Sequence, residues 1–195
     1  MNELWQTDCT YIKIQGWGWY SLSTVLDDFS RYIVAWILTP TLGARDVQDT
    51  LDLALKTSGV TQARVRHRPR LLSDNGSAYL SRELGEYLQE KAMEHTRGAP
   101  CHPMTQGKIE RYHRSIKNVL LLQNYFTPEA VAREIAKFVD CYNNRRYHGS
   151  LDNLTPADVY FGRAKAVRSR SEKIKRDTMA VRRFMANQTR LAAAL

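Results

Sequence analysis

The sequence predicts an α/β protein in which a mixed sheet of five strands is flanked by helices. Two observations predict this fold class. Three runs rich in β-branched and aromatic residues lie before residue 39, separated by short turns that favour antiparallel neighbours. The remainder of the chain then reads helix, strand, helix, strand and further helices. That order indicates a mixed sheet covered on both faces.

The first three strands are expected at residues 4–14, 20–26 and 32–38. Gly16 and Gly18 interrupt the pattern after the first strand, and residues 27–31, Asp-Asp-Phe-Ser-Arg, form the second turn. The third run is the most continuously apolar of the three, which is typical of a strand at the centre of a sheet.

Helical and extended patterns then alternate. Apolar residues at helical spacing predict a helix over residues 44–58, ending at a glycine. A short strand at 71–74 leads into Asn-Gly, a helix at 81–91 follows, and a brief strand is expected at 94–96. Two further helices are predicted to begin near Thr105 and at Thr127, the second with Pro128 at its first position.

Positive charge is concentrated at the end of the chain. The net charge of the 195 residues is +9, and residues 163–195 hold ten Lys or Arg against Glu172 and Asp177. This tail therefore carries 10 − 2 = +8, which leaves +1 for residues 1–162. The chain divides into a core, 1–162, and a basic tail, 163–195, and the tail indicates a polyanion partner such as DNA. A solvated tail, a docking helix and an arm that folds on DNA remain open.

Other features exclude several classes of protein. No apolar run is long enough to cross a bilayer, and no signal pattern opens the chain. The three cysteines are odd in number and lack a paired metal spacing, which suits a reducing compartment. We expect a cytoplasmic protein with no membrane partner.

One carboxylate, Glu110, lies among cations in residues 102–117. On a helix, Ile109, Tyr112, Ile116 and Leu120 form an apolar stripe, and Glu110 lies on an adjacent face. An acid beside cations can hold a divalent metal next to a phosphate, although taken alone an ordinary ion pair explains it better.

Two further acids occupy positions where aspartate is disfavoured. Asp8 falls inside the first strand and Asp74 ends the fourth. The Asp-Asn-Gly turn gives Asp74 a second explanation, whereas no turn explains Asp8. Carboxylates that converge need cations, because like charges force protonation, and their hard oxygens suit Mg²⁺ or Mn²⁺. Asp27 and Asp28 are the competing acids, and turn hydrogen bonds explain them better.

Three stretches resemble the catalytic core of the retroviral-integrase superfamily, most closely bacterial insertion-sequence transposases. They are Trp-Gln-Thr-Asp-Cys-Thr-Tyr at 5–11, Ser-Asp-Asn-Gly at 73–76 and Gly-Lys-Ile-Glu-Arg-Tyr-His at 107–113. Between Asp74 and Glu110 lie 110 − 74 − 1 = 35 residues, the spacing by which these families are known. Shorter matches occur at 28–31 and 142–156, so the resemblance covers residues 5–162.

The resemblance implies an RNase H-like fold and a DDE polynucleotidyl transferase. Asp8, Asp74 and Glu110 are carried over as the catalytic and metal-binding triad, holding two Mg²⁺ or Mn²⁺ ions in the active complex. The family's reaction cuts a phosphodiester at a DNA end and joins the freed 3′-hydroxyl to target DNA. Such a reaction needs in-line geometry and charge neutralisation more than a protein nucleophile.

The resemblance also implies DNA as the partner, with at least a homodimer joining two ends. Lys117 matches the basic residue that the family places near the active site. Weaker candidates for DNA contact are Arg114, Lys108, Arg111, His113, Arg145 and Arg146. For His113, a role in orienting water and a plain surface position remain open.

Two alternatives to a transposase stay open at this point. One is a metal nuclease of the same fold without strand transfer, and the other is a decayed relic that only binds DNA. Relatives of this type usually carry a helix-turn-helix module upstream. We therefore expect the chain to correspond to the catalytic part of a longer, nucleoid-associated bacterial transposase.

Overall fold

The structure is a computed structural model that describes residues 1–60, 68–98 and 106–192, with side chains described up to residue 188. A five-stranded sheet has the order β3-β2-β1-β4-β5. β1 pairs antiparallel with β2 and β2 with β3, whereas β4 and β5 add in parallel. The bounds are β1 Leu4–Ile14, β2 Gly18–Asp27, β3 Ile33–Thr39, β4 Arg70–Ser73 and β5 His95–Arg97. This confirms the predicted mixed sheet.

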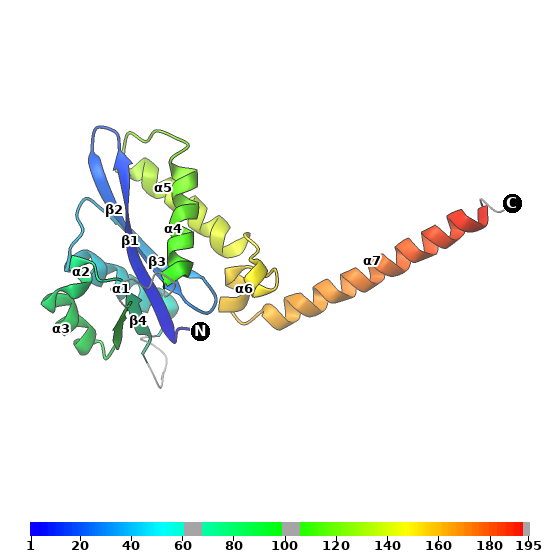
Figure 1. Cartoon of the computed structure of the whole chain (residues 1–195), viewed down its shortest axis with the longest axis horizontal. Coiled ribbons are helices and arrows are strands. Elements are labelled where there is room, and N and C mark those ends of the chain that lie inside the picture. Colours follow the sequence, from blue (N-terminus) through cyan, green and yellow to red (C-terminus); the bar gives the residue numbers. More distant parts are fainter. Residues whose placement is uncertain (61–67, 99–105, 193–195) are drawn as a thin grey trace.

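The helices cover both faces of the sheet, as expected. One apolar core lies between the sheet and α1 (Ala44–Ser58) and α3 (Arg82–Glu90), and a second lies under α4 (Gly107–Leu120) and α5 (Pro128–Asn144). Figure 1 shows α4 running alongside β1, with α5 close to α4. The remaining helices are α2 Ser77–Leu80, η2 Gly149–Leu151, α6 Pro156–Tyr160 and α7 Ala164–Ala192.

Side chains of β1 alternate between the two cores. Trp5 packs with α1 and α3, whereas Ile12 and Ile14 pack with α4 and α5. Residues two apart on a strand point to the same face. Gln6 and Asp8 therefore share the α4 face with the isoleucines, which places Asp8 beneath α4.

The helices predicted from apolar spacing are present. The stripe Ile109, Tyr112, Ile116 and Leu120 is buried in α4, with exposures of 0 to 2%. Thr127 caps α5, because its hydroxyl accepts from the Ala130 backbone N–H, with Pro128 at the first position. The predicted start near Thr105 lies outside the described residues.

Two details of the fold differ from the prediction. β3 lies at the edge of the sheet and not at its centre. Its apolar run is explained by helices on both faces, since Val34 and Ala35 pack in the α1 core and Ile33 in the α4 core. The predicted helix over 81–91 is preceded by the four-residue α2, and Ser81 caps α3 by accepting from the Leu84 N–H.

The basic end of the chain forms the long helix α7. Figure 1 shows it leaving the core beyond α6 and extending away from the sheet. Its apolar side chains Val181 and Phe184 are exposed. Near its start, Arg168 forms an ion pair with Asp152. Among the described helices, none is long and apolar enough to cross a membrane.

Candidate active site

Asp8 lies within β1, and Asp74 directly follows β4, the parallel neighbour of β1. β1 and β4 pair in the register Leu4 to Arg70, Trp5 to Leu71 and Gln6 to Leu72. The pairing ends there, two positions before Asp8 and Asp74, because β4 ends at Ser73. Both aspartates lie close enough to Cys9 for their charges to raise the pKa of its thiol, so they are near each other at this end of β4.

α4 runs along β1 in the same direction and contacts it at two places. The Ile109 N–H donates to Gln6 Oε1 at 3.1 Å, and His113 Nδ1 lies 3.1 Å from Asp8 Oδ2. From Gln6 to Asp8 the strand advances about 6.6 Å, and from Ile109 to His113 the helix advances about 6 Å. The two contacts are therefore compatible with one parallel alignment of α4 and β1. Because Glu110 follows Ile109, these contacts fix the backbone of Glu110 relative to Asp8.

His113 is a buried partner of Asp8. Its side chain is 7% exposed, and its Nε2 lies 3.4 Å from Thr24 Oγ1 on β2. A carboxylate can only accept, so Nδ1 carries a proton and donates to Asp8 Oδ2. The ring is thereby held on both sides, which excludes the surface position considered from the sequence. Its burial also leaves no face for a phosphate, so the expected DNA contact by His113 is not supported.

Asp74 lies in the loop after β4, where its side chain is exposed. Its Oδ1 accepts from the Gly76 N–H at 2.9 Å, the turn hydrogen bond expected from Asp-Asn-Gly. A Cβ at position 76 would lie 3.0 Å from that oxygen, so glycine leaves room for the carboxylate. Oδ2 has no hydrogen-bond partner within the described part of the chain and is available to a cation.

Glu110 lies in the first turn of α4 with its side chain exposed. It forms no ion pair with any described residue, so the ion-pair explanation considered from the sequence does not hold there. Across the described ranges, no group of three His, Cys, Asp or Glu side chains is close enough to hold a metal. The three carboxylates therefore do not form one metal-binding cluster within the described part of the chain.

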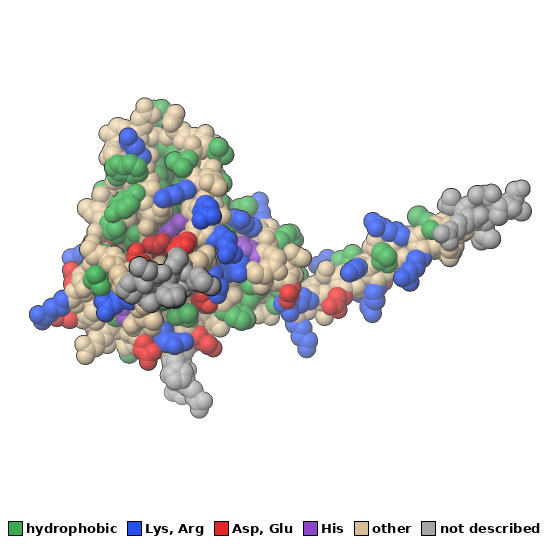
Figure 2. Space-filling view, in the orientation of Figure 1, with side chains coloured by type: hydrophobic (Ala, Val, Ile, Leu, Met, Phe, Trp, Pro, Cys, Tyr) green, Lys and Arg blue, Asp and Glu red, His purple; other side chains and the backbone are tan. Residues whose placement is uncertain are grey.

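The chemistry of these acids fits a hard divalent cation. All three offer carboxylate oxygens, the ligands that Mg²⁺ and Mn²⁺ prefer. Asp74 and Glu110 each keep oxygens that no described group occupies, while Asp8 Oδ1 accepts from the Cys9 N–H at 2.7 Å and Oδ2 faces His113. Figure 2 shows acidic side chains gathered at this region of the surface, next to Lys and Arg side chains over α4.

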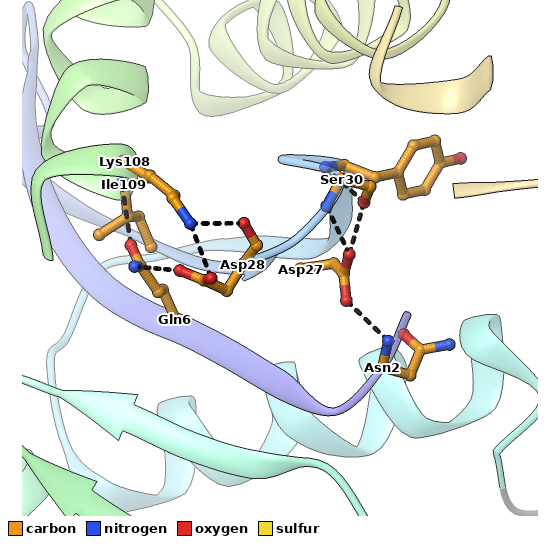
Figure 3. A network of polar contacts seen from close by, with 8 residues as sticks. Asn2, Gln6, Asp27, Asp28, Ser30, Lys108 and Ile109 are labelled. Carbon is orange, nitrogen blue, oxygen red and sulfur yellow. Dashed lines mark hydrogen bonds and ion pairs between the residues drawn. The ribbon is translucent and has the colours of Figure 1, made fainter. Parts of the chain in front are cut away.

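A second polar network fixes the start of α4 (Figure 3). Lys108 Nζ lies 2.7 Å from Asp28 Oδ2 and also donates to the Asp28 carbonyl at 2.9 Å. Gln6 Nε2 donates to Asp28 Oδ1 at 2.8 Å. Gln6 therefore links Asp28 to the Ile109 N–H, and both oxygens of Asp28 are occupied by protein groups.

The neighbouring Asp27 is also satisfied within the protein. It is 1% exposed and accepts from the Asn2 N–H, the Ser30 N–H and the Ser30 hydroxyl at 2.6 to 2.9 Å. The expected turn hydrogen bonds are confirmed for Asp27. For Asp28 the structure corrects the interpretation, because its partners are Gln6 and Lys108 rather than groups of its own turn.

Beneath Asp8, on the opposite face of β1, lies a small buried polar group. The Tyr79 hydroxyl is 3.2 Å from Thr7 Oγ1 and 3.3 Å from Cys9 Sγ. Burial raises the pKa of the Cys9 thiol, and the charges of Asp8 and Asp74 raise it further. Burial likewise holds the pKa of Tyr79 well above its usual value. A neutral thiol is a poor metal ligand, so Cys9 is a packing residue.

The residues expected to contact DNA occupy different environments. Arg114 is exposed on α4, and Arg111 and Arg146 line a small cavity with Lys108. Lys117 lines a groove of about 670 Å³ with Lys13 and Trp19, near the end of α4. Arg145 pairs with Asp140 at 3.4 Å and is 76% exposed.

Two residues of the site were not found from the sequence. Gln6 and Thr24 contact α4 from β1 and β2, respectively, and both are buried. Gln6 lies two residues before Asp8, so strand alternation places it on the same face. A glutamine on the strand face that also carries the apolar Ile12 and Ile14 could have been recognised from the sequence as a buried polar residue. Thr24 carries no comparable signal, because threonine is common in strands.

The fold is that of an integrase or transposase catalytic core, an RNase H-like fold. The chain is similar to the HTLV-2 integrase catalytic core domain solved in complex with magnesium, with a TM-score of 0.63 and 22% identity over 82% of this chain and 96% of that one. It is also similar to the catalytic domain of Mos1 mariner transposase, with a TM-score of 0.61 and 19% identity over 71% and 70%.

Sequence comparison identifies the family. Two family profiles described as Integrase core domain match residues 1–103 and 91–156, and the first covers more than half of the chain. The chain therefore belongs to the integrase core domain family.

Curated relatives include the transposase for insertion sequence element IS904 of Lactococcus lactis, 27% identical over 80% of this chain and 60% of the relative. Transposase InsF for insertion sequence IS3A of Escherichia coli is 26% identical over 80% and 52%. A Gag-Pro-Pol polyprotein of sheep pulmonary adenomatosis virus is 34% identical over 63% of this chain and 6% of that one. The chain thus spans about half to three fifths of the transposases that it matches.

Proposed function

We propose that this chain is a DNA transposase catalytic core that cuts DNA ends and joins a 3′-hydroxyl to target DNA. One observation carries the proposal. Asp8 lies on β1 under α4, where Gln6 and His113 fix the first turns of α4 and with them the backbone of Glu110, and Asp74 directly follows the neighbouring strand β4. The spacing of the three acids and the family membership support the same reaction.

Asp8, Asp74 and Glu110 are the residues that we propose to hold Mg²⁺ or Mn²⁺. Bound divalent cations would activate the attacking oxygen and neutralise charge on the phosphate. By analogy with the family, Asp8 would be the ligand shared between two ions, and Asp74 and Glu110 would each complete one site. His113 donates to Asp8 and orients that carboxylate, while Gln6 fixes the first turn of α4.

The cations of α4 are proposed to hold the DNA backbone beside the acids. Arg111 and Arg114 lie within one turn of Glu110, and Lys117 lies two turns away on the same side. The basic residues of α7 add affinity that does not depend on sequence and falls steeply with salt. Joining two DNA ends supports a dimer or higher multimer on DNA. We keep the division into a core, 1–162, and a basic tail, 163–195, as part of the proposal.

The test compares Glu110→Gln with Glu90→Gln, an exposed glutamate of α3 remote from the site. Purified protein is incubated with pre-cut 3′-hydroxyl DNA ends, target DNA and Mn²⁺, and joined products are quantified. Glu110→Gln should remove joining while keeping salt-sensitive DNA binding, and Glu90→Gln should join like the unmodified chain. Full joining by Glu110→Gln would reject the triad.

The same assay separates the proposed function from its alternatives. Hydrolysis of DNA without any joined product would identify a metal nuclease of this fold. Salt-sensitive binding with neither cleavage nor joining, in either Mg²⁺ or Mn²⁺, would identify a chain that only binds DNA.

A further inference from the structure

A compact group of cations lies beside the acidic site, and Lys108 is its one member that pairs with an acid of the described residues. Arg31, Lys108, Arg111 and Arg146 line one small cavity, together with Tyr112, Ser115, Tyr142 and His148. They come from three separate parts of the chain: the β2–β3 turn, α4 and the segment after α5. The fold, and not a run of basic sequence, brings them together.

Most of this positive charge is uncompensated. Lys108 pairs with Asp28, but Arg31, Arg111 and Arg146 form no ion pair with any residue of the described ranges. Four cations and one carboxylate leave +4 − 1 = +3 around the cavity. Like charges held close together repel, so the arrangement costs free energy until an anion enters.

The charges of the three arginines affect the same two neighbouring side chains. All three lie close enough to Tyr142 and His148 to influence both. Burial and these three charges lower the pKa of His148 to about 4, so the imidazole is neutral near pH 7. Its Nε2 is buried without a hydrogen-bond partner in the described structure. The Arg146 guanidinium lies 5.5 Å from the Tyr142 ring centre, which holds it over the cavity.

The size of the cavity limits the anion. Its volume of about 40 Å³ has room for roughly three waters and suits a single small tetrahedral anion. Guanidinium groups match phosphate oxygens in geometry and charge. Arg111 and Arg146 are exposed at the mouth, whereas Tyr112 and Tyr142 are buried at its base. The opening thus suits a phosphate that belongs to a longer chain outside.

We propose that Arg31, Arg111 and Arg146 form a pocket that binds one phosphate of a DNA backbone next to the acidic site. This inference rests on the proposed function only in taking the phosphate from DNA. Because Arg111 follows Glu110 directly, the pocket holds the strand at a fixed distance from the acids. Arg31 was not among the DNA contacts expected from the sequence.

Binding is measured without catalysis, by fluorescence anisotropy of a labelled 20-base-pair duplex in EDTA over a series of KCl concentrations. Arg31→Gln should weaken binding roughly tenfold and reduce the slope of log affinity against log salt by about 1. The matched control is Arg133→Gln, an exposed arginine of α5 that forms no ion pair with a described residue. It should change affinity less than about twofold. Equal effects of the two variants would overturn the proposal.

A second measurement guards against misfolding and identifies the source of the phosphate. Relief of repulsion should leave the thermal midpoint of Arg31→Gln in chloride buffer unchanged or higher, and Arg146→Gln should behave alike. Inorganic phosphate should raise the midpoint of the unmodified chain, at ionic strength matched with KCl, and have a smaller effect on either variant. Stabilisation by phosphate with unaltered DNA affinity in both variants would overturn the assignment to DNA and leave a site for free phosphate.

The binding test also separates this inference from the proposed function. Glu110→Gln keeps the pocket and should bind the duplex at least as tightly as the unmodified chain, whatever its effect on joining. A chain without joining activity, in which Arg31→Gln still weakens binding, supports the pocket while rejecting the transferase.

Discussion

The acids of this protein fall into two groups that differ in what occupies their oxygens. Asp27 and Asp28, at the end of β2, are surrounded by protein donors, with three hydrogen bonds to Asp27 and both oxygens of Asp28 engaged. Asp74 and Glu110 are exposed and keep oxygens without described partners. Asp28 and Glu110 both lie at the start of α4, but of the two only Glu110 is available to a cation from solution.

This difference separates a structural carboxylate from a functional one. An acid with internal donors contributes to folding, and its removal leaves donors unpaired. An exposed acid without protein donors contributes little to folding, and its oxygens are free to bind a ligand. The two groups can therefore be distinguished experimentally. The same Asp→Asn change should lower activity at Asp74 and stability at Asp28.

The largest expected effect is the loss of joining in Asp74→Asn. Removing a charged ligand of a catalytic metal should lower the rate on the order of a thousandfold. The asparagine oxygen can still accept from the Gly76 N–H, so the thermal midpoint should shift by less than about 2 °C. Joining rate and thermal unfolding are measured on the same preparation. A large loss of stability would place Asp74 with the structural acids.

Asp28→Asn should show the opposite result. It weakens charge-assisted hydrogen bonds from Gln6 and Lys108, which is expected to cost about 1–3 kcal/mol of unfolding free energy. Urea denaturation measures this cost, and joining at a temperature well below the midpoint should fall less than about tenfold. Unaltered stability with abolished joining would break the distinction between the two groups.

Metal binding should stabilise the folded chain only through the exposed acids, Asp74 and Glu110. At ten times its dissociation constant, Mg²⁺ adds about 1.4 kcal/mol to the unmodified chain, a rise of roughly 3–6 °C in the midpoint. The rise should largely vanish in Asp74→Asn, persist in Asp28→Asn and be reversed by EDTA. An equal rise in all three proteins would place the cation elsewhere.

The smallest expected effect concerns His148. Its pKa is about 4 in the folded chain and near 6.5 when unfolded, so folding favours the neutral ring. Its contribution to stability is present above pH 6.5 and is lost as the pH falls towards 4. His148→Gln should flatten the decline of the thermal midpoint across that window, measured in chloride buffers that leave the arginine pocket without phosphate. An unaltered profile would show that other groups cause the decline.

Sequence periodicity predicted the elements whose residues contact a core at regular spacing. The buried stripe of α4 and the capped start of α5 follow from local pattern alone. The edge position of β3 does not, because an apolar run reports burial on both faces and says nothing of neighbouring strands. The four-residue α2 was missed because one turn has too little periodicity to detect.

Residues of the candidate site were predictable to the extent that their type is unusual for their position. An aspartate within a strand identified Asp8 as exceptional, and the family spacing linked Asp74 with Glu110. The contact of Lys108 with Asp28 joins positions 80 residues apart, and no local pattern connects them. Arg31, in a turn, likewise becomes meaningful only when the fold brings it to Arg111 and Arg146.

The hydrogen bond between the Ile109 N–H and Gln6 fixes the position of α4 relative to β1. Gln6 lies two residues before Asp8, and Ile109 lies one residue before Glu110, so a single 3.1 Å hydrogen bond relates the two acids. The separation of their backbones is therefore set when the chain folds. We therefore expect assembly of the proposed metal site to rotate the side chains of Asp8 and Glu110, with β1 and α4 keeping their places.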